Sequence, residues 1–282
     1  MAMKKVLLRL ALLQIFMVME ISSNGQSEKG VPGPIDRKPI VAGAFYPSSK
    51  SQLENDIKMY FDEADQDKNI KPLAIIVPHA GYVFSASVAA SGFKQIDRSS
   101  KFKHIFLIGS SHTMHFNGAA IYTQGDFITP LGKVRIDPLA KELAAKHDMI
   151  VDNPKPHERE HSLEVQLPFL QYWLKNDFSI IPIIIGGESQ VTCTILAEAL
   201  APYFTKENLF IISTDFSHYP SYKNAKQSDE EIAQSILSNS ATQFMKTKLK
   251  NENAGVKDMV TAMCGWTSVL TLLKITEVRS DV

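Results

Sequence analysis

Residues 74–82 read AIIVPHAGY, an apolar run that leads directly into His79. Two further runs have the same layout, because residues 105–113 read IFLIGSSHT and residues 210–219 read FIISTDFSHY. None of the three alternates between apolar and polar residues, as a strand with one face in water would. Runs of this kind are typical of parallel strands that are covered on both faces.

The rest of the chain extends this pattern into a layered α/β domain with a mostly parallel central sheet. We predict four central strands: Leu73–Val77, His104–Ile108, Ile180–Ile185 and Leu209–Ile212. Helical patterns are Ser51–Ala64, Pro138–His147, Ser162–Leu174, Gln227–Lys248 and Met259–Ile275. Pro168 predicts a kink or a late start in the third helix. The glycines of Phe116–Asp137 indicate a hairpin beside the main sheet.

The beginning of the chain is predicted to be a signal peptide. Residues 1–25 contain two early lysines, the apolar stretch Val6–Met19 and small residues at 23 and 25. Because Arg9 interrupts the apolar stretch, an amphipathic helix is the alternative. Cleavage would leave a periplasmic or secreted protein without a membrane span, whereas an uncleaved chain would be cytoplasmic. Residues 26–36 are predicted to be a linker and residues 37–282 a single domain.

Composition excludes one class of partner. The 282 residues have a formal net charge of zero, and no stripe of Lys and Arg recurs on a helical face. The electrostatic footprint of a nucleic-acid-binding protein is therefore absent.

Two cysteines are too few for a disulfide framework, although an exported protein could form one bridge between Cys193 and Cys264. Cys193 lies within a helical pattern and reads as a small buried residue. Cys264 lies near the start of an apolar helical run, where a helix N-terminus favours the reactive thiolate. The residues alone support a reactive and a merely buried Cys264 equally.

The histidines supply the functional signal. In a parallel sheet, ligands bind beyond the carboxyl ends of the strands, so we expect His79, His112, Asp215 and His218 in one crevice. Three imidazoles and a carboxylate could hold a metal ion, or form a general base with its orienting partner. Any one histidine after a strand is more often a cap or a solvent-facing residue, but three in equivalent places make chance a weaker explanation.

A second polar cluster is Glu160, His161 and Glu164 in the segment EREHSLEVQ. We expect His161 and Glu164 to project into the crevice, behind the ligands or against a substrate. The alternative for Glu164 is favourable placement in the first turn of a helix. Four histidines are given no role: His104 and His147, expected in solvent, and His115 and His157, expected in loops.

Seven segments, in this order, resemble the Memo family, which includes the AmmeMemoRadiSam system protein B group of bacteria and archaea. They are RKPIVAGAFYP, VPHAGYVFSASVAA, LIGSSHT, ITPLGKVRID, EHSLEVQLPFL, STDFSHY and MCG, between about Arg37 and Trp266. The resemblance implies a fold similar to the class III extradiol dioxygenases (LigB-like), which are non-haem iron enzymes.

The resemblance also implies a site. His79, His112 and Cys264 would be metal ligands, and Asp215 and His218 would line the same pocket as catalytic residues. Iron and copper are the implied metals, and the donor set also suits zinc. A redox role and a functional link to a radical-SAM protein are implied as well. Because extradiol dioxygenases use two histidines and a carboxylate, a cysteine ligand does not imply ring cleavage.

The C-terminus departs from the family pattern. Family members usually continue with a segment like YANSGD and a final strand of the VGYAA type. This chain ends at Val282 with neither, so the resemblance predicts an early C-terminus and an open sheet edge.

Three functions follow from these observations. The first is a metal-binding redox protein, oxidase-like or oxygenase-like, acting on an unidentified substrate. The second is a hydrolase that activates water with zinc or with a His–Asp pair. The third is a non-catalytic module that binds a peptide or a small molecule.

Overall fold

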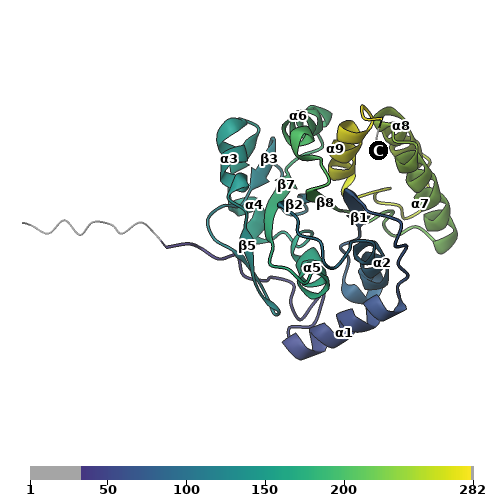
Figure 1. The fold of residues 1–282 in the computed structure, drawn as a ribbon. Coiled ribbons are helices and arrows are strands. Elements are labelled where there is room, and N and C mark those ends of the chain that lie inside the picture. The colour runs from purple at the N-terminus through teal and green to yellow at the C-terminus, as the bar shows by residue number, and fades with distance from the viewer. Residues whose placement is uncertain (1–32, 281–282) are drawn as a thin grey trace, which may run out of the picture. The chain divides into compact units, whose positions relative to one another are not determined.

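Parallel strands with helices on both faces form the structure, a computed structural model that describes residues 33–280 (Figure 1). The predicted signal peptide and most of the predicted linker lie outside the described residues. The strands are β1 (Ala74–Val77), β2 (His104–Ser110), β3 (Ala119–Ile121), β4 (Phe127–Thr129), β5 (Gly132–Ile136), β6 (Ile150–Asp152), β7 (Ser179–Ile185) and β8 (Asn208–Ser213). The four predicted central strands are confirmed as β1, β2, β7 and β8, with ends that differ by at most two residues.

Most helices lie between these strands in the chain, and three follow the last of them. The helices are α1 (Lys50–Glu63), α2 (Tyr82–Lys94), α3 (Leu139–Lys146), α4 (Lys155–Glu158), α5 (Leu167–Trp173), α6 (Gln190–Leu200), α7 (Tyr222–Leu237), α8 (Ala241–Glu252) and α9 (Trp266–Thr276), with short 3₁₀ turns η1 (Glu164–Gln166) and η2 (Ala201–Tyr203). None of the helices within residues 33–280 is long and apolar enough to cross a membrane.

The sheet has the order β1-β8-β2-β7-β3-β6, with β5 also pairing with β7 and β4 pairing with β5. The first four strands are mutually parallel, whereas β3 runs antiparallel to β7. The sheet is therefore mostly parallel, as predicted. The predicted hairpin is confirmed in β4 and β5, but β3, from the same predicted segment, joins the main sheet instead.

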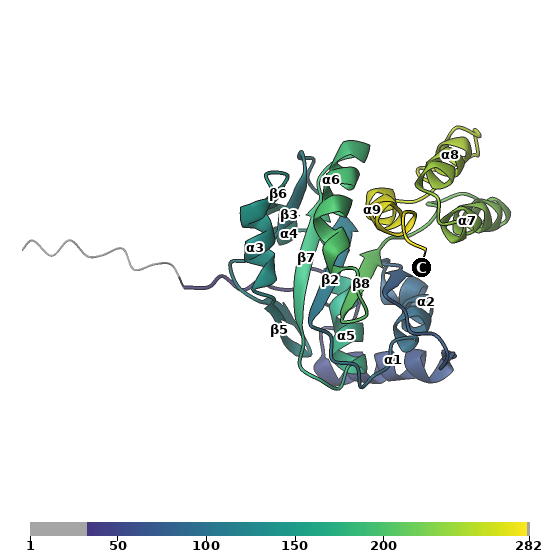
Figure 2. The ribbon, with the colours of Figure 1, turned by 45° about the horizontal axis from the view of Figure 1, so that its top comes forward.

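Alternate residues of each central strand pack on opposite faces of the sheet. In β2, Phe106 and Ile108 belong to one apolar cluster, while Ile105 and Leu107 belong to the other. Helices α2 and α5 lie on one face with α1 outside them, and α3, α6 and α9 lie on the other, where α8 packs against α9 and α7 against α8 (Figure 2). Burial on both faces is the reason for the continuous apolar runs in the sequence.

Pro182 lies in the middle of β7, where a proline normally disrupts a sheet because it has no N–H to donate. Residues 179–180 of β7 pair with β5, and residues 183–185 pair with β3. Pro182 therefore falls in the gap between these two partners. The proline is tolerated because no strand pairs with it on this side.

Two predicted helices begin or end elsewhere. The predicted helix Gln227–Lys248 is two helices, because Asn239 turns the chain with a φ of 49° and the Ser240 side chain caps α8. The predicted helix Met259–Ile275 begins only at α9, because the backbone N–H groups of Val260 and Cys264 donate to His218 and Asp215. Pro168 lies in the first turn of α5, which confirms the late start.

The turn at Asn239 gives a stability prediction. The Asn239 side chain makes two hydrogen bonds with the end of α9. It donates to the Thr276 carbonyl at 3.2 Å and accepts from the Thr276 hydroxyl at 2.5 Å. We expect Asn239→Ala to lower the free energy of unfolding by about 2 kcal/mol, through left-handed strain and lost hydrogen bonds. Urea denaturation measures this. The control is Asn253→Ala, at the exposed end of α8 with a φ of −89°, which should change stability by at most about 0.5 kcal/mol; equal losses in both variants would contradict the proposed role of the turn.

Candidate metal centre

The carboxyl ends of β1, β8 and β2 bring three of the predicted residues together. His79 follows β1, Asp215 follows β8 and His112 follows β2, and these strands are neighbours in the sheet. The imidazole rings of His79 and His112 have centroids 4.8 Å apart. The expectation that strand ends would gather these side chains is therefore confirmed for their positions.

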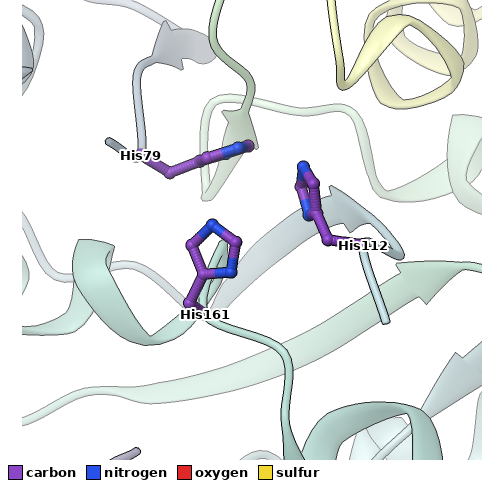
Figure 3. A group of neighbouring side chains, drawn as sticks. All are labelled: His79, His112 and His161. Atoms are coloured by element: carbon purple, nitrogen blue, oxygen red, sulfur yellow. The ribbon is translucent and has the colours of Figure 1, made fainter. Parts of the chain in front are cut away.

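A third imidazole completes the cluster from a segment that is not a strand. His161 precedes η1, and its ring centroid lies 5.3 Å from that of His79 and 4.8 Å from that of His112 (Figure 3). One potential ligand atom from each of these histidines lies within 4.8 Å of the others. The same criterion groups His79 with Asp215 and Cys264. His161 thus stands among the candidate ligands, rather than behind them as the sequence suggested.

Ser213 determines which nitrogen of His79 faces the cluster. The Ser213 hydroxyl donates to the Ser162 carbonyl at 2.6 Å and accepts from the Gln166 amide at 2.9 Å. Its remaining lone pair meets His79 Nδ1 at 3.0 Å. Because a hydroxyl has one proton and two lone pairs, neutral His79 carries its proton on Nδ1. The lone pair on Nε2 is therefore free to bind a metal.

Glu160 plays the same part for His112. Its buried carboxylate accepts from His112 Nδ1 at 2.9 Å and from the His112 backbone N–H at 2.6 Å. Burial opposes the charged carboxylate, but the hydrogen bonds from His112 and from the Ser162 backbone lower the pKa of Glu160 to about 2. A carboxylate behind a histidine ligand is common at metal sites, since it fixes the ring and increases its basicity.

Cys264 reaches the cluster from the last part of the chain. Its Sγ lies 3.3 Å from His79 Nε2 and 3.3 Å from the backbone N–H of Asp215. Burial opposes the thiolate, but its interactions with His112 and His79 lower the pKa of Cys264 to about 6. Burial likewise opposes a protonated His112, yet its bonds with Cys264 and Glu160 raise the pKa of His112 to about 10. A thiolate beside an imidazolium therefore describes the metal-free cluster near neutral pH.

Gly265 allows Cys264 to come this close. A Cβ atom at Gly265 would lie 2.6 Å from the Thr214 side chain and 2.8 Å from the Ser213 carbonyl. The Gly265 N–H donates to Thr214 Oγ1 at 2.9 Å. Only a residue without a side chain permits this approach.

His161 differs from its neighbours in charge. Burial and the neighbouring His79 lower the pKa of His161 to about 4, so the ring is neutral at physiological pH. The Phe45 ring packs against His161 with its centroid 5.0 Å away. A neutral imidazole beside an aromatic wall can bind a metal without first losing a proton.

Glu164 does not project into the crevice, contrary to the expectation from the sequence. Its buried carboxylate pairs with Arg37, accepts from the Tyr46 hydroxyl at 2.6 Å and receives the backbone N–H groups of Ile40 and Val41. It thus binds the N-terminal segment that carries Phe45. Glu164 acts on the site through the position of that segment.

Asp215 lies against the histidine cluster, whereas His218 makes its contacts elsewhere. Asp215 Oδ1 accepts from the His79 backbone N–H at 2.7 Å, and Oδ2 lies 3.7 Å from His79 Nε2. His218 donates from Nδ1 to the Phe216 carbonyl at 2.8 Å and pairs with Thr261 through its backbone. Neither of the two ligand groups includes His218. Its predicted catalytic role stays a prediction.

Two of the histidines without a predicted role also differ from expectation. His104 is mostly shielded from solvent, since its side chain is only 16% exposed, and its Nδ1 lies 2.9 Å from Asp137 Oδ2. His157 lies in α4 rather than in a loop, and burial lowers its pKa to about 3. The two cysteines are both free in the structure, so the disulfide considered from the sequence is not formed.

An open cavity adjoins the cluster on the side of His112 and Cys264. Its volume is about 580 Å³, enough for a small organic molecule. It is lined by Ser110, Ser111, His112, Thr113, Met114, His115, Ile185, Gly186, Gly187, Glu188, Cys264, Trp266 and Thr267. Hydroxyl groups, imidazoles and one carboxylate make most of this wall polar.

Comparison with known proteins agrees with this layout. The chain matches the family described as Memo-like protein over residues 37–281. The chain belongs to the Memo family. A MEMO1 family protein of Thermoplasma volcanium is 34% identical over 240 residues, which cover 85% of each chain. Another, from Caldivirga maquilingensis, is 33% identical over 251 residues, covering 85% of this chain and 86% of the relative.

Among solved structures, this Memo-family chain is similar to an uncharacterized protein from Escherichia coli K12. The TM-score is 0.48 at 12% identity, and the match covers 74% of this chain and 89% of that one. A similarity of this size bears on neither mechanism nor substrate.

The low pKa of Cys264 predicts its reactivity. In metal-free protein, alkylation by iodoacetamide should rise with pH through a midpoint near 6 rather than near the ordinary thiol value of 9.0, because the thiolate is the nucleophile. Mass spectrometry of protein labelled between pH 5 and 9 measures the midpoint. Cys193→Ser should leave the profile unchanged, since burial raises the pKa of Cys193 to about 11. A midpoint above 8 would contradict the hydrogen bonds assigned to Cys264.

The position of Glu164 gives a separate prediction. We expect Glu164→Gln to lower the free energy of unfolding by about 3 kcal/mol, because it leaves the buried Arg37 guanidinium without its counter-charge. Glu142→Gln, at an exposed position on α3, is the control and should change stability by at most about 0.5 kcal/mol. Chemical denaturation measures the loss. If Glu164 instead projected into the crevice, as the sequence suggested, Glu164→Gln would weaken ligand binding and leave the free energy of unfolding unchanged.

Proposed function

We propose that this protein binds one transition-metal ion through His79, His112 and His161, with Cys264 as a fourth donor, and serves a redox reaction on a small substrate. The observation that carries the proposal is that three imidazoles each place one potential ligand nitrogen within 4.8 Å of the others. Ser213 and Glu160 support it further, because they bind Nδ1 of His79 and His112 and so turn Nε2 of each ring toward a common centre.

The donor set favours iron or copper and also accepts zinc. Imidazole suits all three metals, and a thiolate adds affinity for the softer ones. Iron or copper would supply one-electron redox chemistry at this position. Near neutral pH Cys264 is already ionised and His161 is neutral, so His112 is the donor that must release a proton when a metal binds.

Residues around the proposed metal site would bind the substrate and accept a proton. The cavity beside His112 and Cys264 would hold the substrate next to the ion. Asp215 Oδ2, at 3.7 Å from His79 Nε2, is positioned to accept a proton at the edge of the site, and His218 is our second candidate for this task. Phe45 packs edge-on against the His161 ring.

Metal titration of the purified apo-protein tests the proposal. We expect one equivalent of copper, iron or zinc to bind, measured by elemental analysis after gel filtration and by calorimetry. His79→Ala, His161→Ala and Cys264→Ser should each weaken binding by at least tenfold, and Ser213→Ala by about 10–100-fold through its effect on His79. His147→Ala, at the end of α3 away from the cluster, is the control and should bind as the wild type does. Failure of the wild-type protein to take up any of the three metals would sink the proposal.

A zinc hydrolase is the second candidate, and the specific observation for it is the approach of Asp215 to His79. In that chemistry a carboxylate assists the activation of water, and a thiolate ligand is dispensable. Hydrolytic activity that survives Cys264→Ser but is lost in Asp215→Asn would favour this function over the redox one.

A further inference from the structure

Of the three imidazoles in the proposed metal centre, that of His161 is the one that no hydrogen bond fixes in the described part of the chain. The rings of His79 and His112 are fixed through Nδ1 by a hydroxyl and a carboxylate. His161 Nδ1 lies 3.6 Å from Glu160 Oε1, which is beyond hydrogen-bond distance. His161 also follows no strand, because it lies between α4 and η1 (Figure 3). Its position therefore depends on whatever holds the segment around it.

Arg37 holds this segment at three points, on both sides of His161. Its Nε donates to the His157 carbonyl at 3.1 Å, and its Nη2 donates to the Glu160 carbonyl at 2.6 Å. Its Nη1 pairs with the Glu164 carboxylate, and the Arg37 side chain is only 3% exposed. Two of these acceptors precede His161 in the chain and the third follows it. A planar guanidinium suits this arrangement, because its donors point in several fixed directions at once.

Arg37 is in turn fixed by the hairpin of β4 and β5. Its backbone N–H donates to the Asp126 carbonyl at 2.8 Å, and its carbonyl accepts from the Ile128 N–H at 2.9 Å. Gly125 makes room for this pairing, because a Cβ atom there would lie 2.3 Å from the Ile35 carbonyl oxygen. Backbone pairing with the hairpin therefore determines where the guanidinium lies.

Residues 34–46, which we name the strap, continue from this hairpin to the metal cluster. Two backbone N–H groups of the strap donate to the Glu164 carboxylate. Near the end of the strap, the Phe45 carbonyl accepts the N–H of Tyr82 at 2.8 Å, and the Phe45 ring packs edge-on against His161. The strap therefore contacts both the residues that flank the proposed ligand and its ring.

We propose that Arg37 is a positioning residue for His161, so that docking of the strap and binding of the metal stabilise each other. This inference rests on the proposed metal site. Because linkage is reciprocal, a docked strap that raises metal affinity is itself held more tightly when the metal is bound. Displacement of the strap would lower metal affinity without a change in any ligand.

The effect of Arg37 should pass through His161 and not through His112. Arg37 binds Glu160 at its carbonyl. The Glu160 carboxylate, which holds His112, is fixed separately by the Ser162 backbone N–H at 3.0 Å. Loss of the guanidinium therefore leaves the support of His112 in place.

A double-mutant cycle on the full-length protein tests this route, with zinc affinity measured by competition against a chromophoric chelator. Arg37→Lys keeps the charge but loses the fork of donors, and we expect it to weaken zinc binding about tenfold. In the His161→Ala background the same change should have no further effect, because the ligand that Arg37 positions is absent. A role in stability alone would weaken zinc binding by the same factor in both backgrounds.

Arg98→Lys is the matched control. The Arg98 side chain also donates to a backbone carbonyl, that of Trp173 at 3.1 Å, and lies 4.6 Å over an aromatic ring. Its partners belong to α5 and not to the metal cluster. Arg98→Lys should therefore leave zinc affinity unchanged.

A readout on metal-free protein separates this inference from the metal site itself. Diethyl pyrocarbonate modifies accessible imidazoles, and peptide mass spectrometry gives the rate at each histidine. We expect Arg37→Lys to raise the rate at His161 about threefold through local opening of its segment, with His147 as the unchanged internal reference. In the wild type, zinc should slow hydrogen exchange at Ile40 and Val41, whose N–H groups bind Glu164 in the strap contact.

Two results would overturn the proposal. One is an equal loss of zinc affinity from Arg37→Lys with and without His161. The other is an unchanged modification rate at His161 in the metal-free variant. If the wild-type protein binds no metal, the proposed function fails and the coupling fails with it, whereas a raised rate at His161 would still support the positioning role of Arg37.

Discussion

The neighbouring parallel strands β1, β8 and β2 end at the same height in the sheet, and the candidate site depends on this alignment. In the register of the sheet, Ser213 of β8 lies opposite Val77 of β1 on one side and opposite Gly109 of β2 on the other. His79, Asp215 and His112 each follow within three residues of that level. Parallel pairing alone therefore gathers side chains from distant parts of the sequence at one height above the sheet.

What makes this a defined site is a set of buried polar partners behind the imidazoles. Ser213 and Glu160 each satisfy several donors, and each leaves one histidine nitrogen free toward the centre. Hydrogen bonds to such buried partners fix the orientation of the imidazole rings. The cluster is therefore preorganised, with Cys264 and His112 balancing each other's charge until an ion replaces the proton between them.

The sequence predicts the framework of the sheet well, because short apolar runs without alternation, bounded by turns, are typical of strands buried on both faces. It also predicts His79, His112 and Asp215 at one edge, since strand ends of a parallel sheet must converge. It places His161 and Glu164 poorly: both belong to one short segment around η1, and nothing in the spacing says that one points to the crevice and the other to Arg37. Their directions depend on the docking of the N-terminal segment, which is a long-range event that local patterns do not encode. The position of Cys264 likewise rests on Gly265 and Thr214, a contact visible only in three dimensions.

The distance along the chain between the parts of the site has a consequence for biosynthesis. His79 and Cys264 meet across 185 residues, and synthesis at about 5–20 residues per second separates their appearance by roughly 10–40 s. During that interval the nascent chain holds its imidazoles without the thiolate, and α9 is not yet present to close the cavity. The complete cluster therefore forms only after Cys264 has been synthesised and α9 has docked against the sheet.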